Sequence, residues 1–130
     1  MIFVDTGAWF ARYVPADPHH FRVKARLDSS TEPLLTTDYC VDETLTLLAA
    51  RGRLPRAIEV GRAMFEAGVV HLHFLRPDEI HRAWILFCER AAAGWSFTDC
   101  TSKVVIDELG VTTAIALDNH FHQFGITVLP

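Results

Sequence analysis

The chain has 130 residues, half of them hydrophobic and 22% charged, and these proportions exclude a disordered chain, which buries too little apolar surface to fold. The length is that of one ordinary domain, so we expect a single domain over residues 1–130. The formal charge of −4 argues against a protein that coats nucleic acid through basic charge alone. A nuclease is not excluded, because a metal ion bound at an acidic site reverses the local field that a phosphate meets.

The cysteines and the hydropathy of the chain indicate in which cellular compartment the protein is found. The three cysteines are odd in number and lack the spacing of metal ligands, which is typical of reduced thiols in a cytosolic protein. Asp5 interrupts the first apolar run, so no signal peptide is predicted, and no apolar stretch approaches the length of a membrane span. We therefore expect a cytoplasmic protein without a membrane segment.

The first half of the chain alternates short apolar segments with helical stretches. In chain order we predict a strand, two helices, a strand and two further helices at residues 2–5, 7–13, 18–29, 34–36, 38–52 and 54–68. Thr37 and Asp38 suit the start of the fifth of these elements, and Gly52 suits its end. Pro55 falls in the first turn of the sixth element, and Gly68 lies at its end.

The second half continues this alternation. We predict a strand, two helices, a strand, a short turn or helix and a last strand at residues 69–75, 77–94, 98–110, 113–117, 119–124 and 127–129. Strands that alternate with helices form a parallel sheet with helices on both faces, so the predicted fold class is α/β. Sheets of this kind bind ligands beyond the carboxyl ends of their strands.

Four carboxylates occur where a carboxylate is unexpected. Asp5 and Asp118 directly follow apolar runs that we predict as strands. Glu43 lies inside an otherwise apolar helix, and Asp99 lies at the start of another, where the helix dipole favours an anion. A buried carboxylate is unfavourable unless it is paired or binds a metal. The four acids therefore predict one divalent-cation site, and hard oxygen ligands select Mg²⁺ or Mn²⁺.

Each acid also has a structural explanation. Glu43 shares its helix face with Leu47, whereas Asp42 is turned about 100° away toward solvent. We select Glu43 as the ligand, with an ordinary, partly exposed helix residue as an equal alternative. Asp99 taken alone is better explained by helix capping, and Asp118 is compatible with an Asp-Asn turn. The prediction of a metal site depends on the set of four.

Three hydroxyl groups adjoin these acids. Thr6 and Thr98 are each next to an acid in the sequence, and Ser102 lies one turn after Asp99 on the same helix face. Their hydroxyls can orient a carboxylate or a water on the metal. For Thr98 helix capping is the favoured alternative, and for Ser102 the alternative is a neutral position on the helix surface.

The other polar and aromatic residues are predicted to lie outside the site. Solvated helix faces are predicted for Glu59, Glu66, Asp78, Glu79, Asp107 and Glu108. A solvated surface is favoured over a phosphate contact for Arg51, Arg53, Arg56 and Arg62. The seven histidines lack the spacing of a zinc site, so no histidine metal site is predicted. Packing in the core or at an interface is predicted for Trp9, Trp84 and Trp95.

Four segments around the acids resemble one known family. They are IFVDTGAW at residues 2–9, LTTDYCVDETL at 35–45, WSFTDCTS at 95–102 and ALDNHF at 116–121. The segment FGITVL at residues 124–129 is similar to the closing strand of that family. Each segment is weak evidence alone, but their order and spacing resemble the PIN-domain family, and specifically VapC-type toxins of toxin–antitoxin pairs, over essentially the full chain.

The resemblance implies a three-layer α/β/α sandwich with a central parallel sheet and a Mg²⁺- or Mn²⁺-dependent endoribonuclease activity. Asp5, Glu43, Asp99 and Asp118 match the acidic quartet of the family, although the fourth acid is its most variable position. Thr98 matches a frequent hydroxyl residue, whereas Cys100 stands where a small residue such as alanine is common. The resemblance also implies a homodimer, a small antitoxin that covers the site, and an RNA substrate, with tRNA, rRNA and mRNA left open.

Rival functions make different demands on the sequence. A phosphatase of the haloacid-dehalogenase type needs a second aspartate two residues after the first, and that position is Gly7. A phospho-acceptor receiver domain needs an acidic pair before the acceptor strand and a lysine after one of the last strands. Neither pattern is present. A non-catalytic PIN-like module that binds a protein or RNA remains the alternative. Stoichiometric binding without metal and without cleavage would support it.

Overall fold

The computed structural model describes residues 1–130, and its centre is one five-stranded sheet. The strands are β1 (Ile2–Val4), β2 (Leu34–Thr37), β3 (His71–His73), β4 (Thr113–Ile115) and β5 (Thr127–Leu129). Their order in the sheet is β3-β2-β1-β4-β5, and every neighbouring pair is parallel. In the central strand, Phe3 pairs with Leu35 on one side and with Ala114 on the other. The parallel sheet that the alternation of elements predicted is therefore confirmed.

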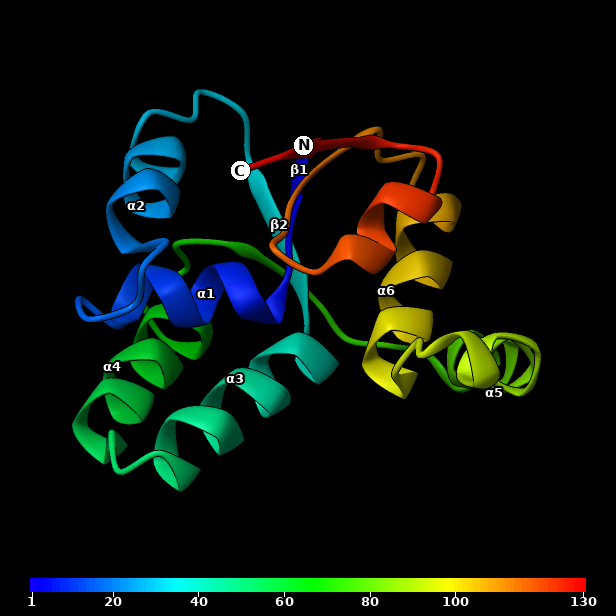
Figure 1. The fold of residues 1–130 in the computed structure, drawn as a ribbon, viewed down its shortest axis with the longest axis horizontal. Helices are drawn as coiled ribbons and strands as arrows, with labels where there is room; N and C mark the ends of the chain where they lie inside the picture. Colours follow the sequence, from blue (N-terminus) through cyan, green and yellow to red (C-terminus); the bar gives the residue numbers. More distant parts are fainter.

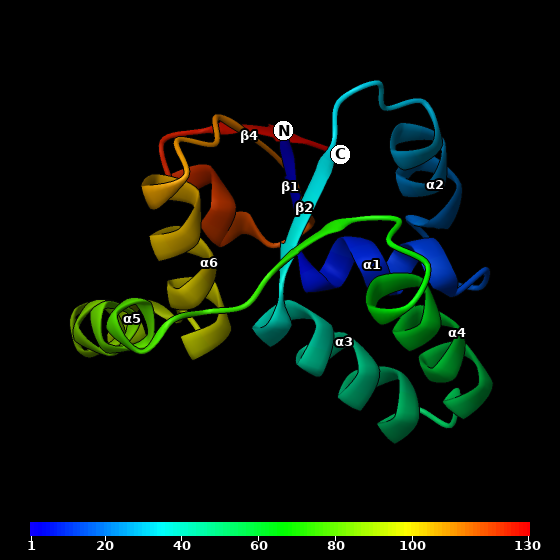
Figure 2. The same cartoon turned by 180° about the vertical axis from the view of Figure 1, so that it is seen from behind.

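Helices cover both faces of this sheet. They are α1 (Thr6–Tyr13), α2 (His20–Asp28), α3 (Asp38–Ala50), α4 (Leu54–Phe65), α5 (Pro77–Arg90) and α6 (Phe97–Glu108), with short 3₁₀ helices at Ala91–Ala93 (η1) and Asn119–Gln123 (η2). Helices α1 to α4 lie on one side of the sheet and α5 and α6 on the other, as the front and rear views show (Figures 1 and 2). None of the helices combines the length and hydropathy needed to cross a membrane.

Alternating strand residues divide the core into two layers. Successive strand side chains point to opposite faces, so Val4 and Ile115 pack into the cluster beneath α1 to α4, whereas Phe3 and Ala114 pack into the cluster that contains α6. The near-continuous apolar strands are those expected of a sheet buried on both faces. The architecture is the α/β/α sandwich that the family resemblance implied.

Most predicted boundaries differ from the structure by a few residues, and two of these differences are informative. The strand predicted at residues 69–75 spans only His71–His73, because β3 is an edge strand with one neighbour. The helix predicted to begin at Thr98 begins at Phe97, with Ser96 as its N-cap. The Ser96 hydroxyl accepts a hydrogen bond from the backbone N–H of Asp99 at 3.0 Å. The helix-capping alternative for Thr98 is therefore wrong.

Glu79 was predicted to be solvated, but its side chain is fully buried. His73, the last residue of β3, contacts the carboxylate of Glu79, with its Nε2 lying 2.9 and 3.1 Å from the two carboxylate oxygens. The backbone N–H of Arg76 donates to Glu79 Oε1 at 2.8 Å. The prediction was wrong because these partners come from the segment before α5, and they satisfy the carboxylate without water.

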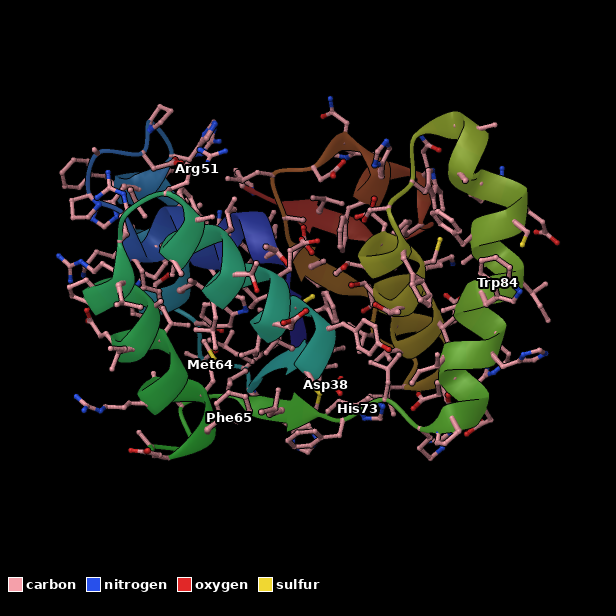
Figure 3. The ribbon with its side chains drawn as sticks, turned by 90° about the horizontal axis from the view of Figure 1, so that it is seen from below. Asp38, Arg51, Met64, Phe65, His73 and Trp84 are labelled. Atoms are coloured by element: carbon pink, nitrogen blue, oxygen red, sulfur yellow. The ribbon has the colours of Figure 1, made fainter.

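The three tryptophans have different environments. Trp9 and Trp95 are buried, and the indole N–H of Trp9 donates to Thr36 Oγ1 at 3.1 Å. Trp84 remains 53% exposed, so of its two predicted places the core is excluded and an interface stays a prediction. Figure 3 shows it on α5, on the side of the molecule away from α3 and α4. The same figure shows Asp38, at the start of α3, beside His73 of β3.

The buried carboxylate of Glu79 predicts a clear effect on stability. Glu79→Ala removes the partner of His73 and of the backbone N–H of Arg76, and leaves both groups underpaired. We expect a loss of about 2 kcal/mol in the free energy of unfolding, measured by urea denaturation. Glu89→Ala on the exposed face of the same helix is the matched control, and equal effects of the two changes would contradict the structural role of Glu79.

Candidate metal centre

The candidate centre lies at the carboxyl edge of the sheet. Asp5 directly follows β1 and is the N-cap residue of α1, while Asp118 follows β4 and caps η2. Glu43 lies on α3, which continues directly from β2, and Asp99 lies in the first turn of α6. Figure 1 shows α1 and α3 beginning at the same end of β1 and β2. The edge is the one at which parallel α/β sheets bind their ligands.

Asp5 and Asp99 are the two buried acids of the four, each with 5% of its surface exposed. Asp5 has a strongly raised pKa. Burial raises the pKa of its carboxyl to about 7, although a hydrogen bond from the Thr6 backbone favours the charged form. The charges of Asp99, Glu43 and Asp118 raise this pKa further. All three of the other acids thus act on Asp5, and the structure brings the four carboxylates into one electrostatic group.

Cys40 links Asp5 to α3, and its contact with Ser102 continues this link to α6. The thiol of Cys40 on α3 lies 3.8 Å from Asp5 Oδ1 and 3.5 Å from the hydroxyl of Ser102 on α6. Glu43 is three residues after Cys40 and Asp99 is three residues before Ser102, so each acid shares a helix face with a residue of this contact. The buried contact between α3 and α6 thereby turns both acids toward Asp5.

The hydroxyl residues occupy different positions in the centre. Ser102 is fully buried, so its alternative assignment to a helix surface is wrong. The Thr6 hydroxyl donates to the backbone carbonyl of Cys40 at 3.5 Å rather than to a carboxylate. Thr98 is half-buried beside Asp99, and its backbone carbonyl accepts from the Thr101 hydroxyl at 2.7 Å. Burial raises the pKa of the Cys40 thiol to about 12, so this sulfur stays protonated.

Asp99 has a capping role and a position in the acidic group at the same time. Its Oδ2 accepts from the backbone N–H of Ser96 at 2.8 Å, which completes a reciprocal capping box. The same oxygen lies 3.1 Å from Nδ1 of His120. Both hydrogen bonds to the carboxylate use Oδ2, so Oδ1 is left for another ligand. Capping and ligand binding are therefore not exclusive explanations for Asp99.

Glu43 and Asp118 are more accessible than Asp5 and Asp99. Glu43 is half-buried whereas Asp42 is exposed, which agrees with the helix face on which Glu43 was selected. The side chain of Asp118 is 41% accessible. Its Oδ1 accepts from the backbone N–H of His120 at 2.9 Å. These two acids lie where a ligand in solvent can reach them.

His120 is the residue of this centre that sequence reasoning missed. The ligand atoms of Asp99, Asp118 and His120 all lie within 4.8 Å of one another, a spacing that can hold a metal ion. Spacing along the chain gave no sign of a histidine site, because Asp99 is 21 residues away. The available signal was the order Asp-x-His after β4. An aspartate whose side chain accepts from the backbone N–H two residues later turns the chain sharply, which keeps that later residue close to the carboxylate.

The donor set fits a divalent cation. None of the four acids forms an ion pair with a lysine or arginine, and the only basic side chain that contacts them is His120. Several carboxylates that lack cationic partners are stabilised together by a divalent ion. The oxygen donors suit Mg²⁺ or Mn²⁺. The residues present therefore fit the metal that the family resemblance implied.

The parallel sheet, its two helical layers and the acidic group at its carboxyl edge define a PIN-like α/β/α protein. No protein-family model matches the chain. The 23S rRNA-specific endonuclease VapC20 of Mycobacterium tuberculosis is 32% identical over 126 residues, covering 96% of this chain and 95% of that protein. A VapC ribonuclease of Archaeoglobus fulgidus is 32% identical over 123 residues, covering 91% of this chain and 77% of that protein.

Solved structures give the same result. The crystal structure of Mycobacterium tuberculosis VapC20, a sarcin-ricin loop cleaving toxin, superposes with a TM-score of 0.91 at 28% identity and covers 98% of this chain and 97% of its own. FitAcB of Neisseria gonorrhoeae, at 18% identity and a TM-score of 0.68 over 100% of this chain and 97% of its own, shares the fold. The chain belongs to the VapC family of PIN-domain ribonucleases, which confirms the family and the class of enzyme that its motifs predicted.

The raised pKa of Asp5 predicts how stability depends on pH in the metal-free protein. The carboxyl titrates near pH 4 in the unfolded chain and at about pH 7 in the folded one, so between these values the folded state binds more protons. Stability therefore falls as pH rises from about 4 to about 7 and levels off above, by an amount on the order of 4 kcal/mol.

Asp5→Asn imitates the protonated carboxyl and should remove this fall. We expect the variant to match the wild type near pH 4 and to be the more stable protein at pH 8, as measured by urea denaturation in EDTA. A variant that is less stable than the wild type at pH 8 would show that the charged carboxylate has a structural role.

Proposed function

We propose that Asp5, Glu43, Asp99 and Asp118 bind Mg²⁺ or Mn²⁺ and that this centre hydrolyses phosphodiester bonds of RNA. The observation that supports this most strongly is the electrostatic group itself, in which three carboxylates act on a buried fourth and none has a lysine or arginine partner. Membership of the VapC family supplies the class of reaction. The whole of residues 1–130 forms one catalytic domain in this proposal, because β1 and β5 belong to the same sheet.

The proposed reaction needs no side-chain nucleophile. The oxygen of a water bonds to phosphorus and gives a proton to solvent while the bond to the 3′ oxygen breaks, and that oxygen leaves with a proton from solvent. When bound, a divalent ion supplies the positive charge that orients the phosphate and makes water a stronger nucleophile near neutral pH. Because the pKa of Asp5 is raised to about 7, part of the metal-free protein keeps this proton at neutral pH, and binding of the cation displaces it.

The remaining residues orient the ligands. The Cys40 thiol contacts Asp5 and is itself held by the Ser102 hydroxyl, and Thr6 ties the start of α1 to α3 through the Cys40 carbonyl. Asp99 presents Oδ1 because Ser96 and His120 engage Oδ2. In this proposal Thr98, at the half-buried position next to Asp99, orients a water at the centre. Such supporting contacts typically change metal affinity or activity by about 10- to 100-fold.

Ribosomal RNA is the substrate class that we propose first. The support comes from VapC20 of Mycobacterium tuberculosis, which is 32% identical over nearly all of this chain and is a 23S rRNA-specific endonuclease. That protein is a sarcin-ricin loop cleaving toxin. Transfer RNA and messenger RNA are the other substrates to test. Loop sequences in RNA are recognised through unstacked bases, so the substrate should present a structured loop rather than a plain duplex.

The proposed partners are a small antitoxin and a second copy of this chain, in the cytoplasm. Toxin–antitoxin pairing is a property of the VapC class, and a free ribonuclease would damage its own cell. Apolar side chains remain exposed on the outer helices, where a partner can cover them. They are Leu54, Ile58 and Phe65 on α4, and Trp84 and Ile85 on α5.

The proposal predicts cleavage of an RNA pool that contains ribosomal and transfer RNA by the purified chain, with Mg²⁺ or Mn²⁺ and not with EDTA. Asp99→Asn should reduce the cleavage rate by at least about 100-fold, because loss of a metal ligand removes several kcal/mol of transition-state stabilisation. Asp107→Asn is the matched control, since Asp107 is an exposed acid on the same helix, paired with Lys103.

The outcome also separates the enzyme from the non-catalytic alternative. Stoichiometric RNA or protein binding without cleavage in either metal, by protein shown to be folded and free of antitoxin, would support a binding module. Cleavage that Asp99→Asn leaves intact would contradict the proposed centre, because the activity would then come from elsewhere in the chain or from a contaminant.

A further inference from the structure

His120 connects the third and fourth acids of the centre. Its Nδ1 lies 3.1 Å from Asp99 Oδ2 and 3.0 Å from Asp118 Oδ1. A ring nitrogen that faces two carboxylate oxygens at hydrogen-bond distance carries a proton, because a lone pair would repel both oxygens. Nδ1–H is therefore a donor shared between the two acids. Its backbone N–H also donates to Asp118 Oδ1, at 2.9 Å.

The backbone N–H of His120 holds Asp118 locally, whereas the His120 ring ties it to Asp99. Asp118 lies outside the helices and strands, between β4 and η2, and its side chain is 41% accessible. The His120 ring is the only side chain that bonds it. Asp99, by contrast, is held by the capping box with Ser96. The imidazole is thus the link between an acid on a loop and an acid held by a capping box at the start of α6.

The ring itself is held in a defined slot. It packs against the buried ring of Trp95, with centroids 6.3 Å apart and planes 31° apart. The indole N–H of Trp95 donates to Gln123 Oε1 at 3.2 Å, which fixes the surface against which the imidazole packs. Gly94 also lies close to the ring: it adopts φ +88, and a Cβ there would lie 3.5 Å from His120 Nε2. The imidazole therefore has little freedom to turn away from the two acids.

We propose that His120 is a positioning residue that brings Asp118 to Asp99 and thereby completes the divalent-cation site. The inference rests on the proposed metal centre and deepens it. The imidazole acts as a hydrogen-bond donor from Nδ1 and is not itself a ligand of the ion. Without that donor, Asp118 would move away from Asp99 into solvent, and the site would bind a divalent cation with fewer carboxylate ligands.

The test is the affinity of metal-free protein for Mn²⁺, measured by calorimetry. His120→Phe keeps a ring against Trp95 and removes the donor, so Mn²⁺ should bind about 10- to 100-fold more weakly, the range typical of residues that orient metal ligands. His120→Asn places an amide N–H near the position of Nδ1 and should recover most of the affinity. His122→Phe is the matched control, because His122 is exposed on the same 3₁₀ helix.

A spectroscopic measurement separates positioning from direct ligation. Pulsed electron paramagnetic resonance of bound Mn²⁺ should show no nitrogen coupling from an imidazole in the wild type. Nitrogen coupling that His120→Phe abolishes would overturn the positioning role in favour of ligation. Wild-type affinity in His120→Phe would overturn this inference alone. A folded wild-type protein that binds no Mn²⁺ would overturn the inference together with the proposed metal centre.

Discussion

A buried carboxylate without a basic partner is the constraint around which the site is arranged. Asp5 ends the central strand, is 5% exposed, and meets the charges of Asp99, Glu43 and Asp118. Charge in such a place is unfavourable unless something neutralises it. A proton can neutralise Asp5 alone, whereas a divalent cation can neutralise several carboxylates at once. The same arrangement that disfavours the charged metal-free centre therefore creates its affinity for a cation.

The fold supplies this arrangement through three junctions. The central position of β1 in the parallel sheet buries Asp5, and the strand leads directly into α1. Helices α3 and α6 approach from opposite layers and meet through Cys40 and Ser102, whose small side chains allow the close contact. Acids three residues from each contact then face the centre. The fourth acid comes from the loop after β4, and it is attached by an imidazole rather than by the packing of a helix.

The order of the elements and the convergence of the four acids could be predicted from local patterns, because apolar strands, proline and glycine boundaries and isolated carboxylates are visible in the sequence. The contacts made across elements could not. Glu79 lies in the first turn of α5, where acids are usually solvated, and the short segment between β3 and α5 brings His73 to its carboxylate. Ser96 and Thr98 are both good N-cap residues, and the aspartate three residues after Ser96 decides between them by completing the capping box.

The most direct test of the account is thermal unfolding at pH 8 in EDTA and in increasing Mn²⁺, for the wild type and for Asp5→Asn. A cation that binds only the folded state raises the unfolding temperature by mass action. The account predicts a saturable rise for the wild type and a much smaller rise for Asp5→Asn, which starts from a higher unfolding temperature in EDTA. An unfolding temperature that Mn²⁺ leaves unchanged, or raises equally in both proteins, would contradict the claim that the buried carboxylate group is a cation site.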